Sequence, residues 1–221
     1  AANSSSALTR QLLAFSRRQI LAKEVTDINE VVTGSERMLT RLIGENVTLH
    51  LELQEGVLRG VMDPGQIEQV LMNLCINARD AMVGGGHITI KTERLSEQDE
   101  RVRAGVREEL DCEWMHITVT DTGQGKPREI RERIFEPFFS TKGNDGTGLG
   151  LSVVHGIIIQ HDGHIEVESE VGAGTIFHIY LPVDDSLEDK KPAKVAGKVS
   201  ALGGNEKILV IEDEPQVRTF V

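Results

Sequence analysis

Two asparagines and an aspartate lie at helical spacing within the stretch NLCINARDAM, residues 73–82. On a helix, Asn73, Asn77 and Asp80 would share one stripe at the border between the apolar face and solvent. An asparagine carbonyl is a hard oxygen ligand that suits a magnesium ion holding substrate phosphates. Polar residues that merely border solvent would give the same pattern. The stripe therefore indicates a magnesium site only if a phosphate site lies nearby.

Two glycine-rich segments offer sites for phosphates and for a flat ring. GTGLGL, residues 146–151, opens a predicted helix, whose backbone N–H groups and positive end can hold phosphates. It is neither a Walker loop, because no Gly-Lys-Ser/Thr follows, nor a Rossmann fingerprint, because the preceding strand is missing. DTGQG, residues 121–125, would present Asp121 to an exocyclic amine, with glycines that let a ring approach the backbone. Taken alone, DTGQG is equally typical of a surface turn.

Helices must position these residues, and the sequence marks where they begin and end. Asp27 is a predicted N-cap of a helix that Gly44 ends. Asp63 followed by proline begins the helix that carries the polar stripe, which should run to about residue 82. Another helix follows GTGLGL, over residues 149–163. The apolar arc expected to face the core from the stripe helix is Ile67, Val70, Leu71, Leu74, Ala78, Ala81 and Met82.

Alternating apolar residues predict a set of strands. The predicted strands are 47–53, 58–62, 87–95, 114–121, 164–171 and 175–183. The first two are expected to be neighbours, and the last two are joined by the tight turn GAG. Residues 95–113 are charged and aperiodic, which indicates a solvated excursion.

Composition argues against several classes of protein. A net charge of −11 and a pI near 5.1 disfavour a nucleic-acid partner. No run of about 18 apolar residues and no leader are found, so we expect a cytoplasmic protein without membrane contact. Cys75 and Cys112 lack metal-ligand spacing and predict neither a zinc site nor a disulfide. The polar residues 184–206, with their proline and glycines, predict a linker after a globular unit that closes near residue 183.

Five motifs in one order resemble the ATP-binding catalytic domain of sensor histidine kinases, within the Bergerat-fold ATPase group. They are NLCINARDAM, DTGQG, IFEPFFSTK, GTGLGL and GAGTIFHIYLP. The resemblance assigns residues 23–183 to that domain and implies an α/β two-layer sandwich, a mixed, largely antiparallel β-sheet with helices on one face. Residues 1–22 resemble the end of a dimerisation and phosphotransfer helix, and residues 207–221 resemble the start of a receiver domain. This layout, with 184–206 as linker, is typical of a hybrid kinase.

The resemblance implies ATP and Mg²⁺ as cofactors. Asn77 matches the asparagine that coordinates magnesium, and Asn73 matches the second asparagine of the same box. Asp121 matches the carboxylate that binds the adenine amine. Lys142 is the candidate for contact with the terminal phosphate. The remaining nucleotide-binding candidates are Asp80, Gly123, Gly125, Phe138, Gly146, Thr147, Gly148, Leu149, Gly150 and Thr175.

An aromatic box, Phe135, Phe138 and Phe139, resembles the anchor of a mobile ATP lid at about residues 126–147. These phenylalanines are at least as consistent with packing in the core as with contact with the ligand. The sequence departs from the family pattern at two positions. Lys126 occupies a position that is usually apolar, and Asp80 replaces a common lysine whose phosphate contact Arg79 or Lys142 would have to supply.

ATP-hydrolysing relatives carry a glutamate, as general base, where this chain has Asn73. An amide cannot take a proton from water near pH 7, so we expect slow hydrolysis and transfer of the phosphoryl group to a protein histidine. Two alternatives are a nucleotide-binding regulatory module without transfer and a hydrolysing Bergerat-fold ATPase.

None of the seven histidines lies in a phosphoacceptor motif, and all are expected to be structural. The acceptor histidine helix is therefore expected upstream, and a receiver domain or response regulator is the expected recipient. This stretch of chain is expected to be a monomer, and the full-length kinase a homodimer.

Overall fold

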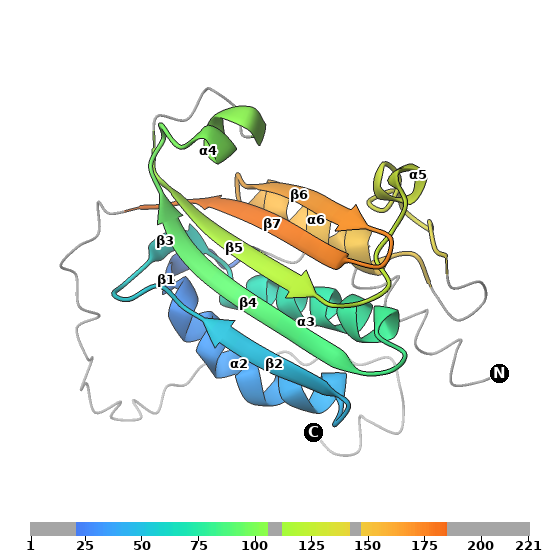
Figure 1. Ribbon diagram of the computed structural model, residues 1–221. Helices are drawn as coiled ribbons and strands as arrows, with labels where there is room; N and C mark the ends of the chain where they lie inside the picture. The colour runs from blue at the N-terminus through green and yellow to red at the C-terminus, as the bar shows by residue number, and fades with distance from the viewer. Residues whose placement is uncertain (1–20, 106–111, 142–146, 185–221) are drawn as a thin grey trace, which may run out of the picture. The chain divides into compact units, whose positions relative to one another are not determined.

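The computed structural model of the protein describes residues 21–105, 112–141 and 147–184 (Figure 1). The chain divides into two units, Ala1–Leu187 and Glu188–Val221, and all described residues belong to the first. The predicted phosphotransfer helix end and receiver start lie outside the described residues and stay predictions, as does the linker.

A five-stranded sheet organises the described unit (Figure 1), in the order β2-β4-β5-β7-β6. Its strands are β2 (Val47–Glu52), β4 (Gly86–Leu95), β5 (Trp114–Asp121), β6 (His164–Glu170) and β7 (Gly174–Pro182). The β2–β4 pair is parallel and the other three pairs are antiparallel. The prediction of a mixed, largely antiparallel sheet is confirmed.

The prediction that residues 58–62 form a neighbour of β2 is wrong. They form β3 (Arg59–Met62), which pairs instead with β1 (Glu24–Asp27), a strand that the sequence pattern missed. The reason lies at the end of β7. The backbone N–H of Asp184 donates to the Arg59 carbonyl at 3.1 Å. A β-carbon on Gly60 would lie 2.8 Å from the Pro182 carbonyl oxygen, so β3 is held there and not at the edge of β2.

Three long helices cover one face of the sheet (Figure 1). They are α2 (Ile28–Ile43), α3 (Pro64–Ala81) and α6 (Gly150–Gln160). Asp27 caps α2 by accepting from Asn29 N at 3.0 Å, and Asp63 caps α3 by accepting from Gln66 N at 3.2 Å. These caps lie where the sequence predicts them, because a short acceptor side chain satisfies first-turn N–H groups that have no partner within the helix.

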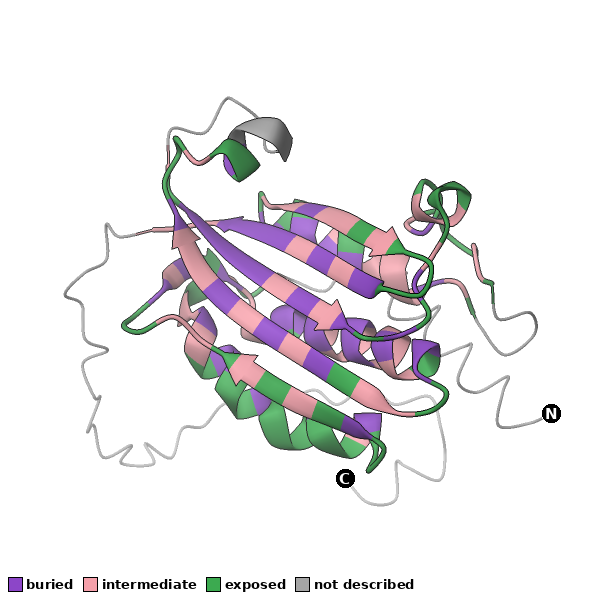
Figure 2. Cartoon of the chain, in the orientation of Figure 1, coloured by how far each residue is buried: buried purple, intermediate pink, exposed green. Residues whose placement is uncertain are grey.

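The core lies between these helices and the sheet. Burial alternates along the strands, as Figure 2 shows, so that Met115, Ile117 and Val119 of β5 face the helices. Every residue of the apolar arc predicted for α3 is buried. Full burial of such a side chain contributes roughly 1.5–3 kcal/mol, which explains why α3 is fixed in rotation and why its polar stripe has a defined direction.

The other face of the sheet is partly covered as well. The short helix α4 (Glu100–Gly105) lies over one end of it, and a second apolar cluster is buried there. That cluster consists of Leu95, Val102, Trp114 and Tyr180. The sequence predicts a solvated excursion at 95–113. The structure corrects this expectation, because Val102 is buried against the sheet.

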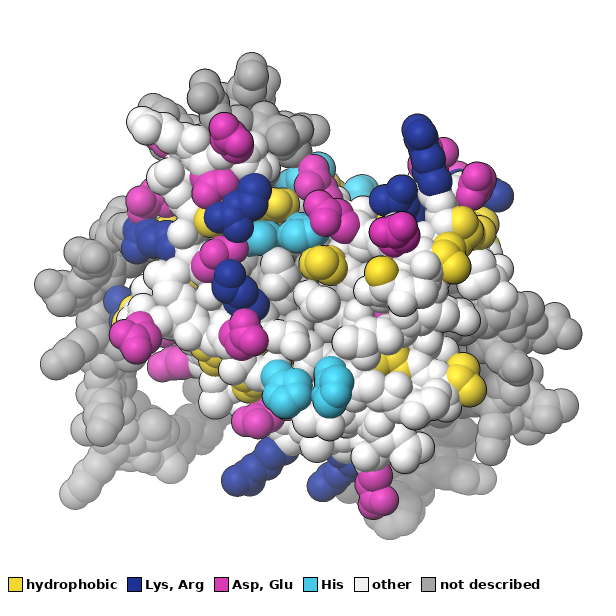
Figure 3. Space-filling view, viewed as in Figure 1, with side chains coloured by type: hydrophobic (Ala, Val, Ile, Leu, Met, Phe, Trp, Pro, Cys, Tyr) yellow, Lys and Arg dark blue, Asp and Glu magenta, His cyan; other side chains and the backbone are white. Residues whose placement is uncertain are grey.

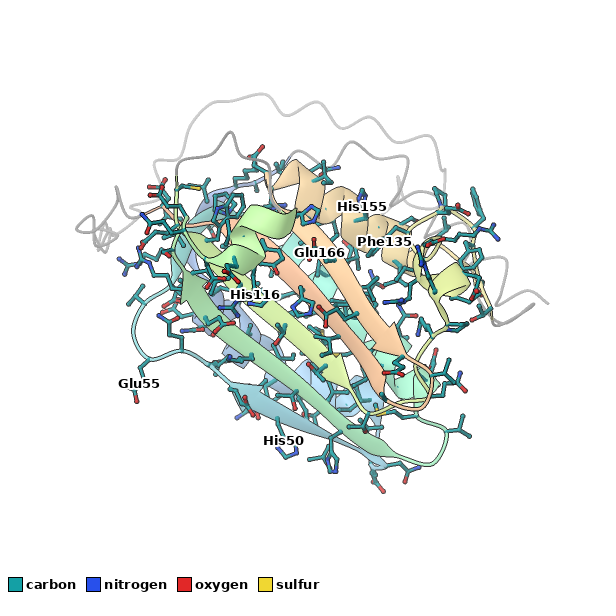
Figure 4. The ribbon with its side chains drawn as sticks, turned by 45° about the horizontal axis from the view of Figure 1, so that its top comes forward. His50, Glu55, His116, Phe135, His155 and Glu166 are labelled. Carbon is teal, nitrogen blue, oxygen red and sulfur yellow. The ribbon has the colours of Figure 1, made fainter. Side chains whose placement is uncertain are left out.

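Polar side chains occupy much of the remaining open face, where histidines are prominent in the space-filling view (Figure 3). His116 points out of β5 on this face (Figure 4), with Nδ1 2.8 Å from Glu93 Oε1 and Nε2 3.1 Å from His178 Nδ1. Its ring is 2% exposed and stacks on Tyr180. The prediction of a structural histidine is therefore confirmed for His116.

No helix within residues 21–105, 112–141 and 147–184 combines the length and apolar character that crossing a membrane requires.

Candidate functional site

A pocket of about 380 Å³ opens beside the polar stripe of α3. Its walls come from α3, from the segment that follows β5 and from the start of α6. Of the predicted site residues, the pocket lining includes Asn73, Asn77, Asp80, Thr147, Gly148 and Gly150. Segments about 70 residues apart in the sequence thus meet around one cavity, and the α3 stripe faces it instead of only bordering solvent.

The two asparagines lie next to the first residue of α6. A β-carbon built on Gly150 would be 3.7 Å from Asn73 Oδ1 and 4.0 Å from the side-chain nitrogen of Asn77. This brings amide groups, which can ligate a hard cation, beside a helix N-terminus, which attracts anions. The arrangement suits a ligand that carries phosphates together with a divalent cation.

The N-terminus of α6 differs from those of α2 and α3 in having no side-chain cap. Its N-cap position is Leu149, which is 4% exposed and provides no acceptor side chain. The first N–H groups of a helix need partners outside the helix. At α6 the N-cap side chain does not satisfy these groups, which suits the binding of an anionic ligand.

Gly148 fixes the shape of the pocket at this end. Its φ is +66°, and a β-carbon there would overlap the backbone of Phe138. The Phe138 N–H donates to the Gly148 carbonyl at 3.0 Å. Glycine is required for this approach, and the approach ties the segment after β5 to the start of α6.

The phenylalanines of the aromatic box have different environments. Phe138, the predicted ligand contact, is 71% exposed and does not line the pocket. Its neighbour Phe139 does line it, with Ile130 and Ile134. Phe135 packs on His155 of α6, with ring centroids 5.4 Å apart (Figure 4).

Asp121 ends β5 beside the pocket rather than in its lining. It is 4% exposed and accepts a hydrogen bond from Gly123 N at 2.8 Å. Its partner in the β7 register is Thr175, which is 1% exposed. Burial raises the pKa of Asp121, while hydrogen bonds from Gly123 and Thr175 act in the opposite direction. A buried carboxyl group held by a backbone donor has a fixed orientation, as an acceptor for a ligand amine requires.

The glycines of DTGQG pack against protein. A β-carbon on Gly125, at φ +66°, would overlap the carbonyl oxygen of Glu170. One on Gly123 would lie 2.8 Å from both Ala81 Cβ and Asp121 Oδ1. The sequence-based interpretation gave these glycines a role in approach to a ring. In the structure, Gly125 is explained by close packing on the end of β6, and Gly123 by space for the Asp121 carboxylate.

The charged candidates separate into three groups. Asp80 lines the pocket and is paired with Arg79, whose Nη2 lies 2.7 Å from Asp80 Oδ1. Arg79 also donates to the Leu42 carbonyl at 2.8 Å and does not line the pocket. Lys126 lines it. Lys142 lies outside the described residues, as does the uncharged candidate Gly146.

The pocket segment matches a known family. Residues 62–185 match the family described as histidine kinase-, DNA gyrase B- and HSP90-like ATPases. The chain belongs to this ATPase family. Membership implies that this part of the chain binds ATP.

Individual relatives agree with that membership. The sensor kinase CckA of Brucella abortus is 42% identical over 98% of this chain. The sensor histidine kinase ZraS of Klebsiella oxytoca is 36% identical over 82% of it. The matches span 24% and 36% of those two proteins, respectively. The resemblance to sensor histidine kinases is thereby confirmed for this part of the chain.

Solved structures give the same fold. The catalytic domain of the histidine kinase ThkA has a TM-score of 0.57 and 29% identity, covering 73% of this chain and 96% of that domain. The mycobacterial sensor histidine kinase MprB has a TM-score of 0.58 at 23% identity, covering 73% of this chain and 98% of the MprB chain, which supports the fold alone.

One residue next to the pocket was missed in the sequence. Ser169 Oγ accepts from Lys126 N at 2.8 Å, donates to the Gly174 carbonyl at 2.7 Å and lies 3.1 Å from Thr175 Oγ1. It therefore links the pocket wall to the Asp121–Thr175 pair. A serine on a strand carries no sequence signal for this role, which depends on the pairing of β6 with β7.

Proposed function

We propose that this part of the chain binds Mg-ATP and donates the terminal phosphoryl group to a protein histidine. The observation that carries the proposal is the position of Asn73 and Asn77 beside the uncapped N-terminus of α6, 3.7 and 4.0 Å from a β-carbon position on Gly150. In a triphosphate with a divalent cation, the phosphates suit the helix N-terminus and the cation suits the amide oxygens.

Magnesium fits the side chains that are present. Among the described residues, no group of three or more His, Cys, Asp or Glu side chains can hold a metal ion by itself. Magnesium bound to nucleotide phosphates needs only one or two protein oxygens, because it keeps several waters. Asn77 would provide the protein ligand, with Asn73 beside it. When bound, the ion would neutralise phosphate charge.

The chain's own groups would then fix the nucleotide in place. The N–H groups at the start of α6 would hold phosphate oxygens, and Asp121 would accept from the adenine amine, supported by Thr175. Phe139, Ile130 and Ile134 form an apolar wall that excludes water. Phosphoryl transfer depends mainly on positioning and charge stabilisation, which this set of groups supplies.

The same residues disfavour hydrolysis. The side chain beside Gly150 is an amide, Asn73, and an amide does not act as a general base near neutral pH. The one carboxylate in the described lining, Asp80, is engaged by Arg79. A bound ATP molecule would therefore keep its terminal phosphoryl group until an acceptor arrives.

The acceptor would come from elsewhere, because no histidine lines the described part of the pocket. His116 and His161 are buried in hydrogen-bonded positions. We therefore place the acceptor on a histidine helix outside the described residues, and we assign the onward transfer to a receiver domain or response regulator. The whole protein would act as a cytoplasmic homodimeric sensor kinase.

Calorimetric titration with a nonhydrolysable ATP analogue, with and without magnesium, tests the site. Asn77→Ala should abolish the magnesium dependence of binding. Asp121→Asn should weaken binding at least about tenfold, because it keeps an acceptor for Gly123 N but presents a donor to the adenine amine. Asn46→Ala and Asp162→Asn, at exposed positions away from the pocket, are the controls.

The transfer step is tested on the full-length protein with ATP labelled on its terminal phosphate. We expect acid-labile, alkali-stable label on histidine, lost in Asn77→Ala. Binding without any transfer would favour a regulatory nucleotide-binding module, and rapid release of phosphate would favour a hydrolysing ATPase. Absence of nucleotide binding by the wild type would refute the proposal.

A further inference from the structure

Three polar side chains form one row across the sheet, where β5 and β6 end and β7 begins (Figure 1). Thr175 of β7 is the register partner of Asp121 in β5 on one side and of Ser169 in β6 on the other. Register partners on antiparallel strands project from the same face of a sheet. Asp121 follows Val119 by two residues, and Val119 faces the helices, so the row lies on the helix side. Ser169 is thus the third member of a row that begins with the carboxyl group assigned to the adenine amine.

The Ser169 hydroxyl is surrounded by partners from three segments. Its single proton goes to the Gly174 carbonyl at 2.7 Å, and its oxygen accepts from the Lys126 backbone N–H at 2.8 Å. A serine oxygen can accept twice, and Thr175 Oγ1 lies 3.1 Å away. Because Ser169 has no second proton, a hydrogen bond between the two hydroxyl groups must be donated by Thr175. Ser169 thereby holds the Thr175 hydroxyl and two backbone groups in place.

Both β7 residues that Ser169 holds act on Asp121. A β-carbon on Gly174 would overlap the Asp121 carbonyl oxygen, so the two backbones are in close contact. Burial raises the pKa of the Asp121 carboxyl group, and hydrogen bonds from the Thr175 backbone and hydroxyl act against that rise. Asp121 and Thr175 are 4% and 1% exposed, so water has little access to replace these contacts. Removing the Ser169 hydroxyl would therefore loosen the surroundings of the carboxyl group without touching it.

We propose that Ser169 is a positioning residue for recognition of the adenine base, because it holds Thr175 and Gly174 and through them orients the Asp121 carboxyl group. The inference rests on the proposed function, which pairs Asp121 with the exocyclic amine. Hydrogen bonds weaken steeply when donor and acceptor are misaligned, so a rotated carboxyl group would bind a fixed amine less well. Ser169 does not belong to the described pocket lining, so it acts only through these neighbours.

Titrations of ADP and of purine riboside diphosphate, both with magnesium, test this assignment on the wild type and on Ser169→Ala. The second nucleotide differs from ADP only in lacking the exocyclic amine. Ser169→Ala should lose about fivefold in affinity for ADP and about twofold or less for the analogue. Ser169→Thr, which keeps the hydroxyl, should recover most of the affinity for ADP. A purely structural role of Ser169 would instead lower both affinities by the same factor.

Ser35→Ala is the matched control. Ser35 is a buried serine of α2 whose Oγ donates to the Val31 carbonyl at 2.8 Å, and it lies outside the described lining. Its replacement should leave the ratio of the two affinities unchanged. Urea unfolding checks that Ser169→Ala is folded. If it is not, Ser169→Cys, whose thiol is only a weak hydrogen-bonding group, is titrated in its place with the same expected ratio.

Three results would overturn the inference. They are equal losses for both nucleotides in Ser169→Ala, no loss for either, and a wild type with the same affinity for both. In each case the wild type still binds nucleotide, so the proposed function would stand. A wild type that binds neither nucleotide nor the nonhydrolysable ATP analogue would overturn both.

Discussion

His161 Nε2 accepts a hydrogen bond from the backbone N–H of Asp63 at 2.9 Å. The other ring nitrogen, Nδ1, lies 2.8 Å from the Ile157 carbonyl and donates to it. Both bonds together require a neutral imidazole, since a protonated ring has no acceptor. The ring is 2% exposed and joins the C-terminal end of α6 to the N-terminus of α3. The two helices that meet at the pocket beside Asn73 and Gly150 are thus also connected at their other ends.

Stability should fall in mild acid because of this ring. Burial lowers the pKa of His161 in the folded state. Its contribution is present in full above the unfolded pKa of about 6.5 and is lost as the pH falls towards the folded value. We expect the free energy of unfolding, measured in urea, to decrease between pH 7 and pH 5.

His161→Gln should reduce that pH dependence and cost roughly 1–3 kcal/mol at pH 7. His116, whose pKa is also lowered by burial, should leave a residual slope of the same sign. The Glu93 carboxyl group does not interfere, because its pKa is lowered to about 2 and it titrates below this window. An unchanged slope in His161→Gln would contradict the neutral ring.

The two cysteines should react at very different rates. Cys75 is fully buried in α3, and burial raises the pKa of its thiol to about 12, so almost no thiolate forms at pH 8. Cys112 is only half-buried. A thiol reagent should label one cysteine per folded chain quickly and the second only on unfolding. Cys112→Ser should abolish the fast reaction, and fast labelling that persists in this variant would contradict the packing of α3.

Gly125 should tolerate a side chain far less well than Gly172, although both have positive φ. At Gly172 a β-carbon would meet nothing within 4 Å, so Gly172→Ala should cost about 1–2 kcal/mol from the backbone alone. At Gly125 it would overlap Glu170, and the cost should be at least about 2 kcal/mol larger. Urea unfolding of the two variants measures the difference in free energy of unfolding. Equal losses of stability would show that the backbone at Glu170 can shift away from a β-carbon at little cost.

Asn73→Glu should increase ATP hydrolysis, because it places a carboxylate beside the start of α6 where an amide now lies. We expect a rise of about tenfold or more in phosphate release, since a positioned general base contributes about 10²–10⁴-fold in evolved sites. Asn46→Glu, an exposed change of the same kind, should have no effect. No rise in Asn73→Glu would argue that the pocket excludes the attacking water for another reason.

Local signals made much of the fold predictable. Asp27 and Asp63 mark the helix starts because capping is a short-range interaction that the sequence records directly. The apolar arc of α3 has a period that only one helix face can satisfy. The place of β3 was missed because it depends on contacts with the distant residues Pro182 and Asp184. Strand β1 was missed because it forms by pairing with β3.

The site shows the same division between local and long-range information. The stripe of Asn73 and Asn77 was predictable from spacing, and the pocket lining contains both. The sequence did not predict which phenylalanine lines the pocket. Phe138 has a φ of +67° where its backbone contacts Gly148, and it is Phe139 that lines the pocket. The role of Ser169 could not be predicted from the sequence, because its hydrogen bonds join residues of different segments.

The parallel pairing of β2 with β4 constrains the order in which the molecule can fold. Parallel strands require a crossover, and here the chain between β2 and β4 contains β3 and α3. Pairing of the edge strand β2 with β4 therefore closes a loop that contains the whole of α3, and such non-local pairing is slow to form. The helix that carries Asn73 and Asn77 is therefore also part of the connection that joins the edge strand to the sheet, so the sheet edge and the pocket depend on one structural element.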